Sequence, residues 1–484
     1  MEKKESFSFI LNQREVACDR LKGEVLVDII RKQYRQLGTT VACREGDCGA
    51  CTVLVGELED NKVKYRSLTS CISPWIHSSA KHVVTVEGIT PSSTEWNPIQ
   101  KAFSDFGATQ CGYCTPGFVI SIIGFFLNAE TLSLEEAREN IDGNICRCTG
   151  YKSIERAIGS LVLAYKDSIE KEGSRIHALV KYGFLPRYFL QIPQQLQELD
   201  HKLEVKEDNL EDNLGEKSRI IVSGGSDLWV QKPDDMVQEP FSHWQKSKRK
   251  PKIREEQGRI FVDKACRVED FKASSIVQKY IPNISEFLRL FASTQIRNQA
   301  SLMGNIVNAS PIGDLTSLLL VLDCTLHTKT RDQEREIPLK NFYKAYKQYD
   351  LQAGEWIDEL SFPQPKAQSF INFEKISRRT LLDIASVNSS AHLEIEDKKL
   401  LHASFSAGGV GPTPLLLQDI SEPLLGGELD ATSIRKAVNL ALREVNPISD
   451  VRGTKKYKLL ALRQLLYGHF LRALPDLSME ALVQ

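Results

Sequence analysis

The sequence lacks the features that would indicate a membrane protein, a secreted protein or a nucleic-acid binder. It has no uninterrupted apolar run of about 18 residues, and the longest candidate, residues 118–127, is too short to span a bilayer. The N-terminus has no apolar core followed by a small-residue cleavage site. A formal net charge of −1 creates no global field for nucleic acid or an anionic membrane. We therefore expect a soluble, cytoplasmic protein with no membrane span and no nucleic-acid partner.

Common catalytic motifs and internal repeats are absent as well. No HExxH motif, GxSxG motif or Walker loop is present, so no catalytic residue is assigned to this chain. With 484 residues, 42% of them hydrophobic, the chain is too long for one ordinary core. Three or four domains are expected.

What the sequence does contain is cysteine in an unusual pattern. Eight of its 11 cysteines form two quartets with different spacings, namely Cys43, Cys48, Cys51 and Cys71, and then Cys111, Cys114, Cys146 and Cys148. The first quartet has the C-x4-C-x2-C…C spacing of a plant-type 2Fe–2S ferredoxin. The second, CxxC followed by CxC, indicates a different scaffold. Cys18, Cys266 and Cys324 remain, and we interpret them as ordinary half-buried thiols.

The residues around the cysteines favour iron–sulfur clusters over zinc or disulfides. Glycine and alanine in the 43–51 loop let the backbone wrap closely around a cluster. A tetrahedral zinc site normally shows two CxxC-like pairs, and a CxC pair is uncommon in structural zinc sites. Cys111 and Cys114 precede a predicted helix, whose exposed amides would stabilise anionic sulfur. A chain that holds two one-electron centres is suited to pass electrons from one to the other, so the sequence predicts a role in electron transfer.

The hydrophobic pattern changes along the chain. Residues 6–20 predict a hairpin, residues 25–37 a helix, and residues 52–55, 65–68 and 82–85 the strands of a small sheet that closes near residue 88. Between residues 98 and 166 the pattern is helical, with Thr115 as N-cap and Pro116 as the first helical residue. Helical segments are expected over 134–140 and 153–165, followed by a linker. A strand-rich region is expected to open near residues 363–365.

Three motifs in this order resemble the iron–sulfur region of the molybdenum hydroxylases, the xanthine dehydrogenase and aldehyde oxidase family. They are VACREGDCGACTVLVG, QCGYCTPGF and GNICRCTGY. The resemblance implies that the first quartet holds a 2Fe–2S cluster nearer the flavin and the second quartet one nearer the molybdopterin. It also implies that Gln110 and Cys148 lie close to the pterin.

The resemblance implies a multidomain α+β fold. The expected parts are a β-grasp plant-type 2Fe–2S ferredoxin domain at 1–88, a helical-bundle 2Fe–2S domain at 89–170 and a linker at 171–195. An α+β FAD-binding domain of the PCMH/VAO type would follow at 196–365, and a C-terminal subdomain like that of the CO dehydrogenase flavoprotein at 366–484. This order is similar to the small subunit of bacterial two-subunit xanthine dehydrogenases.

Two glycine-bearing stretches carry the expected flavin site. The first, RIIVSGGSDL at 219–228, is a strand running into a glycine pair that could present amides to a phosphate, although taken alone such a segment is more often a simple turn. The second, ASLMGNIVNASPIGD at 300–314, resembles the family's other FAD loop. The residues that the resemblance assigns to FAD are Gly224, Gly225, Ser226, Asp227, Phe291, Ser301, Gly304, Asn305, Asn308, Asp314, Lys375 and Asp383.

The sequence departs from the family pattern in three places. Relatives that use NAD usually carry acidic residues in the loop after the Ser-Arg-Arg run, and here Asp383 is the only carboxylate in Thr380-Leu381-Leu382-Asp383. NAD as the final acceptor is therefore in doubt, and a quinone, a carrier protein or oxygen stays open. Met303 and Asn308 are milder departures that leave FAD binding in place. The basic run at 246–252 is interpreted as a solvated loop.

We interpret the chain as the electron-transfer subunit of a molybdenum hydroxylase. A large molybdopterin-binding partner subunit would oxidise a purine such as xanthine, in a dimer of heterodimers serving purine catabolism. Two 2Fe–2S clusters would relay electrons to FAD, which can pass a pair to NAD or another acceptor. The alternatives are a self-standing iron–sulfur flavoprotein NADH reductase, a subunit of an aldehyde oxidase-like hydroxylase with a non-NAD acceptor, and a non-catalytic scaffold.

Overall fold

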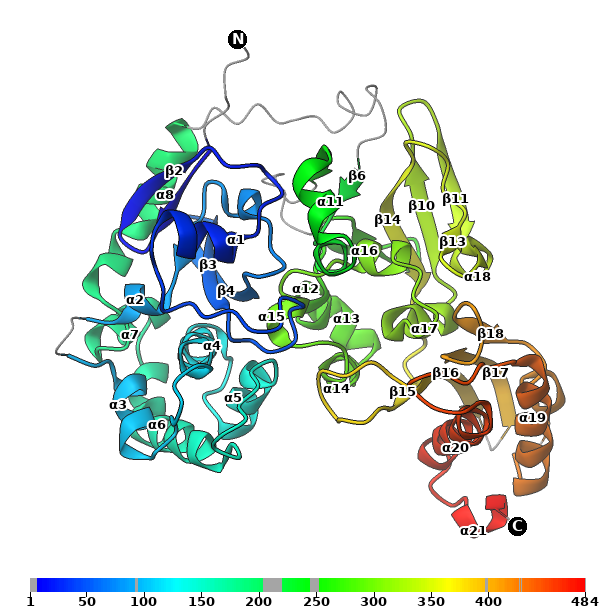
Figure 1. The fold of residues 1–484 in the computed structure, drawn as a ribbon. Coiled ribbons are helices and arrows are strands. Elements are labelled where there is room, and N and C mark those ends of the chain that lie inside the picture. The colour runs from blue at the N-terminus through cyan, green and yellow to red at the C-terminus, as the bar shows by residue number, and fades with distance from the viewer. Residues whose placement is uncertain are drawn as a thin grey trace. The chain divides into compact units, whose positions relative to one another are not determined.

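The structure is a computed structural model, and it describes residues 7–91, 95–202, 220–243, 252–396, 399–425, 427 and 429–483. The chain divides into two compact units (Figure 1). The first unit comprises residues 1–250 and 293–299, and the second comprises residues 251–292 and 300–484. Most of the basic run at 246–252 lies outside the described residues.

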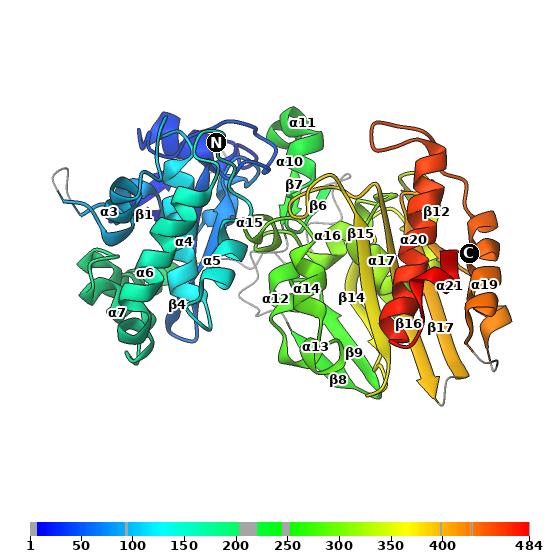
Figure 2. The same cartoon turned by 90° about the horizontal axis from the view of Figure 1, so that it is seen from below.

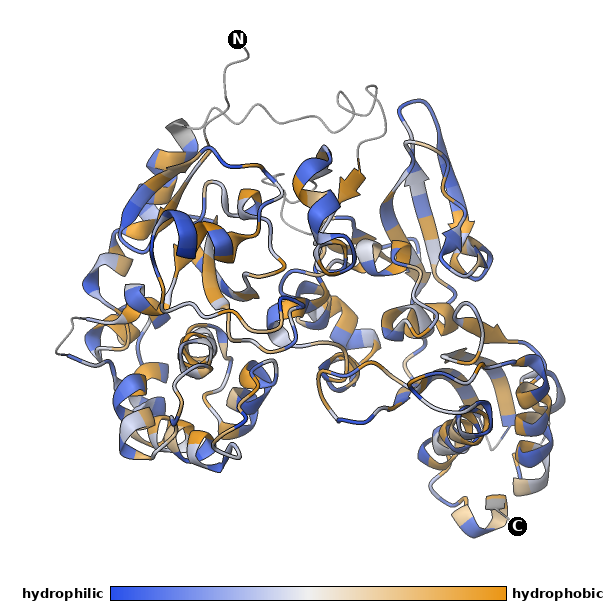
Figure 3. Ribbon diagram, viewed as in Figure 1, coloured by the Kyte–Doolittle hydropathy of each residue, from blue (hydrophilic) through white to orange (hydrophobic). Residues whose placement is uncertain are grey.

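The N-terminal part of the first unit is a five-stranded sheet with the order β2-β1-β5-β3-β4. Its strands are β1 (Phe7–Leu11), β2 (Arg14–Cys18), β3 (Thr52–Glu59), β4 (Lys62–Thr69) and β5 (His82–Val84). The expected hairpin is present as antiparallel β1 and β2, and β1 also pairs in parallel with β5. Hydrophobic positions are frequent in this part of the ribbon (Figure 3). Apolar residues of β1 and β3 share one core that includes Phe9, Val53 and Trp75.

The helix expected over 25–37 is shorter than predicted. It consists of α1 (Leu26–Asp28) and a π-helical turn, η1 (Ile29–Gln33), and its apolar face packs on the sheet through Leu26 and Ile30. Arg35 has a φ of 55°, a left-handed conformation that no helix can continue through. The segment after Gln33 is therefore free to lead into the cysteine loop.

Helices form the next part of the first unit. They are α2 (Val86–Ile89), α3 (Pro98–Asp105), α4 (Thr115–Asn128), α5 (Leu134–Ile141) and α6 (Lys152–Glu170). The apolar run at 118–127 lies in α4, where the residues from Gly117 to Phe126 are buried. Helix α4 is thus hydrophobic all round because it is the core of this part. None of the helices in the described residues combines the length and apolar character needed to cross a bilayer.

The N-terminus of α4 differs from the prediction by one residue. Cys114 occupies the N-cap position and Thr115 is the first helical residue, with Pro116 following it. Pro116 still lies in the first turn, where its missing N–H is not needed by the helix. The shift places a cysteine, rather than the threonine, directly at the start of the helix.

The stretch at 171–195 is packed and largely helical, so its interpretation as a linker was wrong. It contains α7 (Arg175–Lys181), the 3-10 turn η3 (Arg187–Leu190) and the start of α8 (Ile192–Lys202). Leu179, Phe184 and Phe189 are fully buried in the same core as α4. These apolar residues recur every five positions, which matches neither the helical period of 3.6 nor the strand period of 2, so the sequence pattern did not indicate packed helices.

The rest of the first unit packs on the ferredoxin-like sheet region. It contains the parallel strands β6 (Ile220–Val222) and β7 (Phe241–His243), with α10 (Leu228–Gln231) and α11 (Pro233–Gln238) between them. Val222, Trp229 and Met236 share a core cluster with Cys51 and Cys71. The short helix α15 (Thr294–Arg297) returns to this unit from later in the chain.

The second unit begins with a five-stranded antiparallel sheet in the order β11-β10-β14-β9-β8. Its strands are β8 (Ile253–Glu256), β9 (Arg259–Asp263), β10 (Thr325–Lys329), β11 (Glu334–Pro338) and β14 (Trp356–Pro363). The accompanying elements are α12 (Val268–Lys272), α13 (Ser275–Tyr280), α14 (Ile284–Arg289), α16 (Leu302–Val307), α17 (Asp314–Val321), α18 (Leu339–Phe342), β12 (Tyr343–Ala345) and β13 (Gln348–Tyr349).

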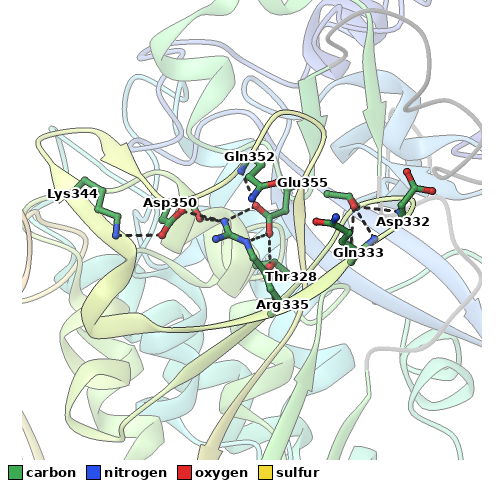
Figure 4. Close-up of polar contacts among 9 residues, drawn as sticks. Thr328, Asp332, Gln333, Arg335, Lys344, Asp350, Gln352 and Glu355 are labelled. Atoms are coloured by element: carbon green, nitrogen blue, oxygen red, sulfur yellow. Dashed lines mark hydrogen bonds and ion pairs between the residues drawn. The ribbon is translucent and has the colours of Figure 1, made fainter.

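One end of this sheet is held by a cluster of charged side chains (Figure 4). Arg335 donates to both carboxylate oxygens of Glu355, at 2.6 and 2.8 Å, and to Asp350 Oδ1 at 3.2 Å. Thr328 Oγ1 and the Gln352 amide also donate to Glu355, whose side chain is 2% exposed. The buried carboxylate is fully hydrogen-bonded, so the cluster has a structural role.

The C-terminal part of the second unit contains the expected strands and, in addition, helices. The antiparallel sheet has the order β15-β16-β17-β18, with strands Phe370–Ile376, Val387–Glu396, Lys399–Gly408 and Leu415–Leu417. The helical elements are η5 (Glu422–Leu424), α19 (Ala431–Glu444), α20 (Lys455–Ala473) and α21 (Met479–Val483). Helices α17 and α20 both contact β16 (Figure 2).

Candidate iron–sulfur and flavin sites

The first cysteine quartet lies on a loop between η1 and β3 and on the turn that follows β4. Gly46 and Gly49 have φ values of 80° and 65°, which a residue with a side chain rarely adopts. A Cβ at Gly49 would meet the Gly143 carbonyl oxygen at 2.4 Å. The Glu45 amide donates to Cys43 Sγ at 3.4 Å. The loop therefore directs backbone amides toward sulfur, as an anionic cluster requires.

The thiols of this quartet interact with one another. A hydrogen bond with Cys48, supported by one with Cys71, holds the pKa of the Cys43 thiol well below its usual range. A hydrogen bond with Cys71 likewise lowers the pKa of Cys51. The same hydrogen bonds raise the pKa of the Cys48 and Cys71 thiols, so the opposite shifts show that the four thiols lie close enough to share protons.

The second quartet is formed by the segment before α4 and by the connection between α5 and α6. Cys111 Sγ and Cys148 Sγ lie 3.5 Å apart, and the thiols of Cys114 and Cys146 also interact. The Thr149 amide donates to Cys146 Sγ at 3.4 Å. The fold thus brings cysteines that are more than 30 residues apart in the sequence into two neighbouring pairs.

The paired arrangement fits a two-iron cluster better than a single ion. A tetrahedral zinc site needs four ligands around one ion, whereas a 2Fe–2S cluster divides four thiolates between two irons. The all-sulfur donor set and the amides near sulfur also fit the cluster.

The two cysteine regions are hydrogen-bonded to each other, which the sequence did not reveal. Asn144 Nδ2 donates to the Gly49 carbonyl oxygen at 3.0 Å, and the Ile145 amide donates to that of Cys48 at 3.0 Å. The Tyr113 hydroxyl donates to the Val41 carbonyl oxygen at 2.5 Å. A Cβ at Gly117 would meet the Gly49 oxygen at 2.2 Å, so only glycine permits this approach.

The two quartets differ in exposure. Cys51 and Cys71 are buried, whereas Cys111 and Cys148 are exposed, as is Gln110. Four large apolar residues of the same region are exposed as well: Phe106 (40%), Tyr113 (50%), Ile145 (38%) and Tyr151 (40%). We call these four residues the apolar patch. The remaining cysteines, Cys18, Cys266 and Cys324, are fully buried rather than half-buried.

The first glycine loop connects β6 to α10 in the first unit. Gly225 has a φ of 71°, and a Cβ there would meet the Trp229 ring at 2.7 Å. Asp227 is the N-cap residue of α10 and accepts a hydrogen bond from Gln231 at 2.7 Å. Ser223 Oγ is buried and has no hydrogen-bond partner within the described residues. A buried hydroxyl without a partner next to Gly224 fits a polar ligand such as FAD.

The second glycine-bearing stretch lies in the second unit. Ser301 is the N-cap of α16 and accepts from the Gly304 amide at 3.0 Å. Asn305 Oδ1 is buried without a partner among the described residues, which again fits a polar ligand. The Asn308 oxygen accepts from Lys347 Nζ at 2.6 Å. Met303 is 5% exposed and belongs to the core.

Lys375 and Asp314 form a buried ion pair in the second unit. Lys375 Nζ lies 2.7 Å from Asp314 Oδ2 and also donates to the Leu290 carbonyl oxygen at 2.7 Å. Asn388 Nδ2 donates to Asp314 Oδ1 at 2.6 Å. The Lys375 side chain is 2% exposed, so its ammonium group is held away from solvent. Burial raises the pKa of Asp314, and Lys375 opposes that rise.

The remaining predicted flavin residues of the second unit are Phe291 and Asp383. Phe291 follows α14 and is half-buried, next to Leu290, whose carbonyl accepts from Lys375. Asp383 accepts from the Arg379 amide at 2.9 Å and from the Ile384 amide at 3.0 Å. Its carboxylate therefore caps its own loop. The predicted residues are thus divided, with the cysteines and Gly224–Asp227 in the first unit and the others in the second.

Four protein families match this chain, one after another from the N-terminus to the C-terminus. Residues 9–74 match the 2Fe–2S iron–sulfur cluster binding domain and residues 85–159 the 2Fe–2S binding domain. Residues 192–365 match the FAD binding domain in molybdopterin dehydrogenase, and residues 372–473 the CO dehydrogenase flavoprotein C-terminal domain.

Similar proteins of established function are much longer than this chain. Aldehyde oxidase 2 of Mus musculus is 28% identical over 98% of this chain, which corresponds to 40% of that protein. Xanthine dehydrogenase of Calliphora vicina is 26% identical over 84% of this chain and 34% of that protein. The chain therefore spans about 40% of the length of such relatives.

Solved structures support the fold. A chain of carbon monoxide dehydrogenase from Hydrogenophaga pseudoflava aligns with a TM-score of 0.52 and 22% identity, over 56% of this chain and 94% of that one. A chain of quinoline 2-oxidoreductase from Pseudomonas putida 86 aligns with a TM-score of 0.51 and 21% identity, over 55% and 92%. The multidomain α+β architecture agrees with the prediction.

The four domain matches, their order and the relatives that share them lead to one conclusion. The chain belongs to the molybdenum hydroxylase family and carries the two 2Fe–2S domains and the FAD-binding domain of that family.

Proposed function

We propose that this chain is the electron-transfer subunit of a molybdenum hydroxylase. The observation that carries the proposal is the direct hydrogen bonding between the two cysteine regions, through Asn144 to Gly49 and through Ile145 to Cys48. Two loops that share backbone hydrogen bonds keep a fixed separation. One-electron carriers bound there would be held close to each other.

The proposed ligands are the eight cysteines of the two quartets. Cys43, Cys48, Cys51 and Cys71 would hold the ferredoxin-type cluster, and Cys111, Cys114, Cys146 and Cys148 the second cluster. When bound, the clusters supply one-electron transfer and FAD supplies a carrier for two electrons. The chain's own contribution is to place amides near sulfur and to bury Cys51 and Cys71 away from water.

The proposed FAD-binding residues are Gly224, Gly225, Ser226 and Asp227 of the first unit, and Phe291, Ser301, Gly304, Asn305, Asn308, Asp314, Lys375 and Asp383 of the second. The unpartnered polar atoms of Ser223 and Asn305 support both loops as ligand-binding segments. Lys375 acts through Asp314, because its ammonium fixes the carboxylate at the start of α17.

We further propose that a large molybdopterin-binding subunit docks on the apolar patch. Phe106, Tyr113, Ile145 and Tyr151 are exposed, and each lies within five residues in sequence of the exposed Cys111 or Cys148. Exposed aromatic residues are enriched at protein interfaces, and covering them would also exclude water from the second cluster. The full assembly would be a cytoplasmic dimer of heterodimers, with domain limits at 1–88, 89–170, 196–365 and 366–484.

For the substrate we propose a purine such as xanthine, supported by the similarity to xanthine dehydrogenase. The second candidate is an aldehyde, which is favoured by the similarity to aldehyde oxidase 2 over 98% of the chain. The acceptor would be NAD or another two-electron acceptor. Asp383 caps its own loop, which favours an acceptor other than NAD because no other carboxylate lies in 380–383.

Composition analysis of the protein purified from its native host tests this proposal. About four iron, four sulfide and one FAD per chain are expected, together with a co-purifying subunit that contains molybdenum. Adding xanthine or an aldehyde to that complex would identify the substrate class by bleaching of the flavin and cluster spectra. Zinc in place of iron would overturn the proposal, and full cofactor content without any partner would favour the self-standing reductase.

The variant Cys148→Ala tests the order of the carriers. It removes a ligand of the cluster proposed to face the partner. Substrate-driven reduction of the flavin should stop, while any NADH-driven reduction should continue. Loss of both reactions in a variant that retains FAD would contradict the relay.

A further inference from the structure

The segment at 293–299 links parts of the first unit that are far apart in the sequence. It lies between Phe291 and Ser301 along the chain, yet it belongs to the first unit. Six of its seven side chains are polar and at most 8% exposed: Ser293, Thr294, Gln295, Arg297, Asn298 and Gln299. Burying so many polar groups is costly unless each is hydrogen-bonded, so the segment has specific partners.

Each of the three amide side chains reaches a different target. Gln295 Nε2 donates to Ser121 Oγ at 2.9 Å and to Asn144 Oδ1 at 3.1 Å, in the helical part. Asn298 Nδ2 donates to the Ser67 carbonyl oxygen of β4 at 3.0 Å. Gln299 alone reaches two proposed cofactor loops.

The Gln299 carboxamide bridges the turn after Cys71 and the first glycine loop. Its Nε2 donates to the Ile72 carbonyl oxygen at 3.1 Å and to the Gly224 carbonyl oxygen at 2.9 Å. Its Oε1 accepts from Ser73 Oγ at 2.5 Å. A primary amide has two N–H donors, and here both are directed at backbone carbonyls of different loops.

The bridge is buried on both sides. Gln299 is 2% exposed, Ile72 is 1% exposed and Ser73 is 2% exposed, so water does not compete for these hydrogen bonds. On the other side, Gly224 is buried and Gly225 is held against Trp229. A displacement of one loop must therefore be transmitted to the other or must break a buried hydrogen bond.

We propose that Gln299 is a positioning residue that couples FAD binding at the Gly224 loop to the environment of the ferredoxin-type cluster at Cys71. This inference rests on the proposed function, because it takes the two loops as cofactor loops. Its physical basis is that one amide nitrogen donates to the peptide next to a cluster ligand and to the peptide that precedes Gly225. The role requires no electron to pass through Gln299 and no atom to be transferred.

The variant Gln299→Met tests the coupling in the full-length protein with its partner subunit. Methionine has nearly the same length and flexibility but no donor, so the core stays filled while both donated hydrogen bonds are lost. The flavin is removed and FAD is titrated back by calorimetry. The electron paramagnetic resonance spectrum of the reduced ferredoxin-type cluster is recorded with and without FAD.

For the wild-type protein, we expect FAD binding to change the spectrum of the ferredoxin-type cluster. For Gln299→Met, we expect the Kd for FAD to rise about tenfold, since two buried hydrogen bonds of about 0.7 kcal/mol each correspond to that factor. The FAD-dependent spectral change should also disappear. Asn298→Leu is the matched control, because Asn298 donates to β4 only, and its Kd should stay within about twofold of wild type.

Three outcomes separate the possibilities. A Gln299→Met Kd within about twofold of wild type, or a wild-type spectrum that FAD does not change, would overturn the coupling. If wild type itself lacks iron or does not bind FAD, the proposed function has failed rather than the coupling. If Gln299→Met does not fold, Ser73→Ala decides, because it removes the hydrogen bond that orients the amide, together with the 3.1 Å contact of Ser73 Oγ with the Thr69 carbonyl oxygen, and leaves Gln299 itself in place. Ser73→Ala should raise the Kd about threefold, and an unchanged Kd would overturn the coupling.

Discussion

Asn144 Nδ2 donates a hydrogen bond of 3.0 Å to the carbonyl oxygen of Gly49. Gly49 lies between two cysteines of the first quartet, and Asn144 lies two residues before the first cysteine of the CxC pair. Asn144 Oδ1 in turn accepts from Ser121 at 2.7 Å, so the amide is fixed in one orientation. One buried side chain thus connects a loop of the ferredoxin-like part to a loop of the helical part.

The Gly49 carbonyl oxygen also lies close to Gly117 of α4. This close approach predicts an unusual response when alanine replaces Gly117. Gly117→Ala in α4 should destabilise the first unit by about 1–3 kcal/mol, although alanine normally stabilises a helix by about 1 kcal/mol relative to glycine. The reason is that a Cβ there would lie 2.2 Å from the Gly49 oxygen and separate the two cysteine loops. Urea unfolding and iron content would measure the effect.

Gly159→Ala in α6 is the matched control for this variant. A Cβ at Gly159 meets nothing within 4 Å, so only helix propensity acts and the substitution should be neutral or stabilising. If the two variants behaved alike, the close approach of α4 to the Gly49 loop would not matter for stability.

A second prediction concerns the buried pair of Lys375 and Asp314. Lys375→Met leaves the Asp314 carboxylate buried without its cation and should cost about 3–5 kcal/mol in the second unit. Amides of β15 and α17 should exchange hydrogen faster in the variant, as measured by mass spectrometry. The affinity for FAD should also fall, because Asp314 is a proposed FAD-binding residue and Lys375 fixes its carboxylate at the start of α17.

The double variant Lys375→Met with Asp314→Asn separates the charge from the packing. Asparagine keeps the shape and removes the unpaired charge, so part of the lost protection should return. Protection no better than in the single variant would mean that packing of the lysine stem, rather than the ion pair, is what stabilises this region.

A third prediction is loss of stability in mild acid. Burial lowers the pKa of His82 to about 3 and that of His469 to about 3, against an ordinary value of about 6.5. His82 accepts from the Tyr65 hydroxyl at 2.7 Å and donates to the Asn12 carbonyl oxygen at 2.8 Å, which requires the neutral ring. His469 is similarly held by Asn372 and Ser389.

The sign of this pH effect follows from whether the folded or the unfolded chain binds the protons. Above pH 6.5 both histidines are neutral in the folded and the unfolded chain. Below about pH 6.5 only the unfolded chain binds the protons, so each histidine should remove about 1.4 kcal/mol of stability per pH unit down to about pH 3. Urea unfolding at pH 7, 6 and 5 would measure the slope. His82→Phe should be less stable at pH 7 but should show a shallower slope, and an unchanged slope would rule out His82 as a contributor.

A fourth prediction tests the docking of the partner on the apolar patch. Ile145→Lys places a charge beside Cys146 without removing the backbone hydrogen bond from the Ile145 amide to Cys48. It should weaken binding of the molybdopterin subunit at least about tenfold while iron and FAD content stay normal. Pull-down and analytical ultracentrifugation would report the change.

Leu163→Lys provides the comparison. Leu163 is 90% exposed on α6 and lies outside the apolar patch, so its replacement should leave partner binding unchanged. Equal loss of binding in both variants would place the interface elsewhere or spread it over a larger surface.

The local features of this protein could be read from its residues. The β1–β2 hairpin, the buried helix around residues 118–127 and the cysteine spacings follow from periodicity, turn residues and ligand geometry that act over a few positions. The boundaries were less accurate. The helix at 25–37 ended early because of the left-handed Arg35, and the segment at 171–195 proved to be packed helix.

The sequence by itself determined which cysteines group together, which domain types are present and their order along the chain, since these depend on spacing and composition. Only the tertiary structure decided that Asn144 connects the two cysteine loops, that Lys375 is buried against Asp314, and that Gln299 bridges the Cys71 turn and the Gly224 loop. These contacts join residues that are 61 positions apart for Lys375 and Asp314 and 227 positions apart for Gln299 and Ile72. They depend on how the chain folds back on itself, and a polar side chain in a sequence does not show which distant carbonyl it will meet.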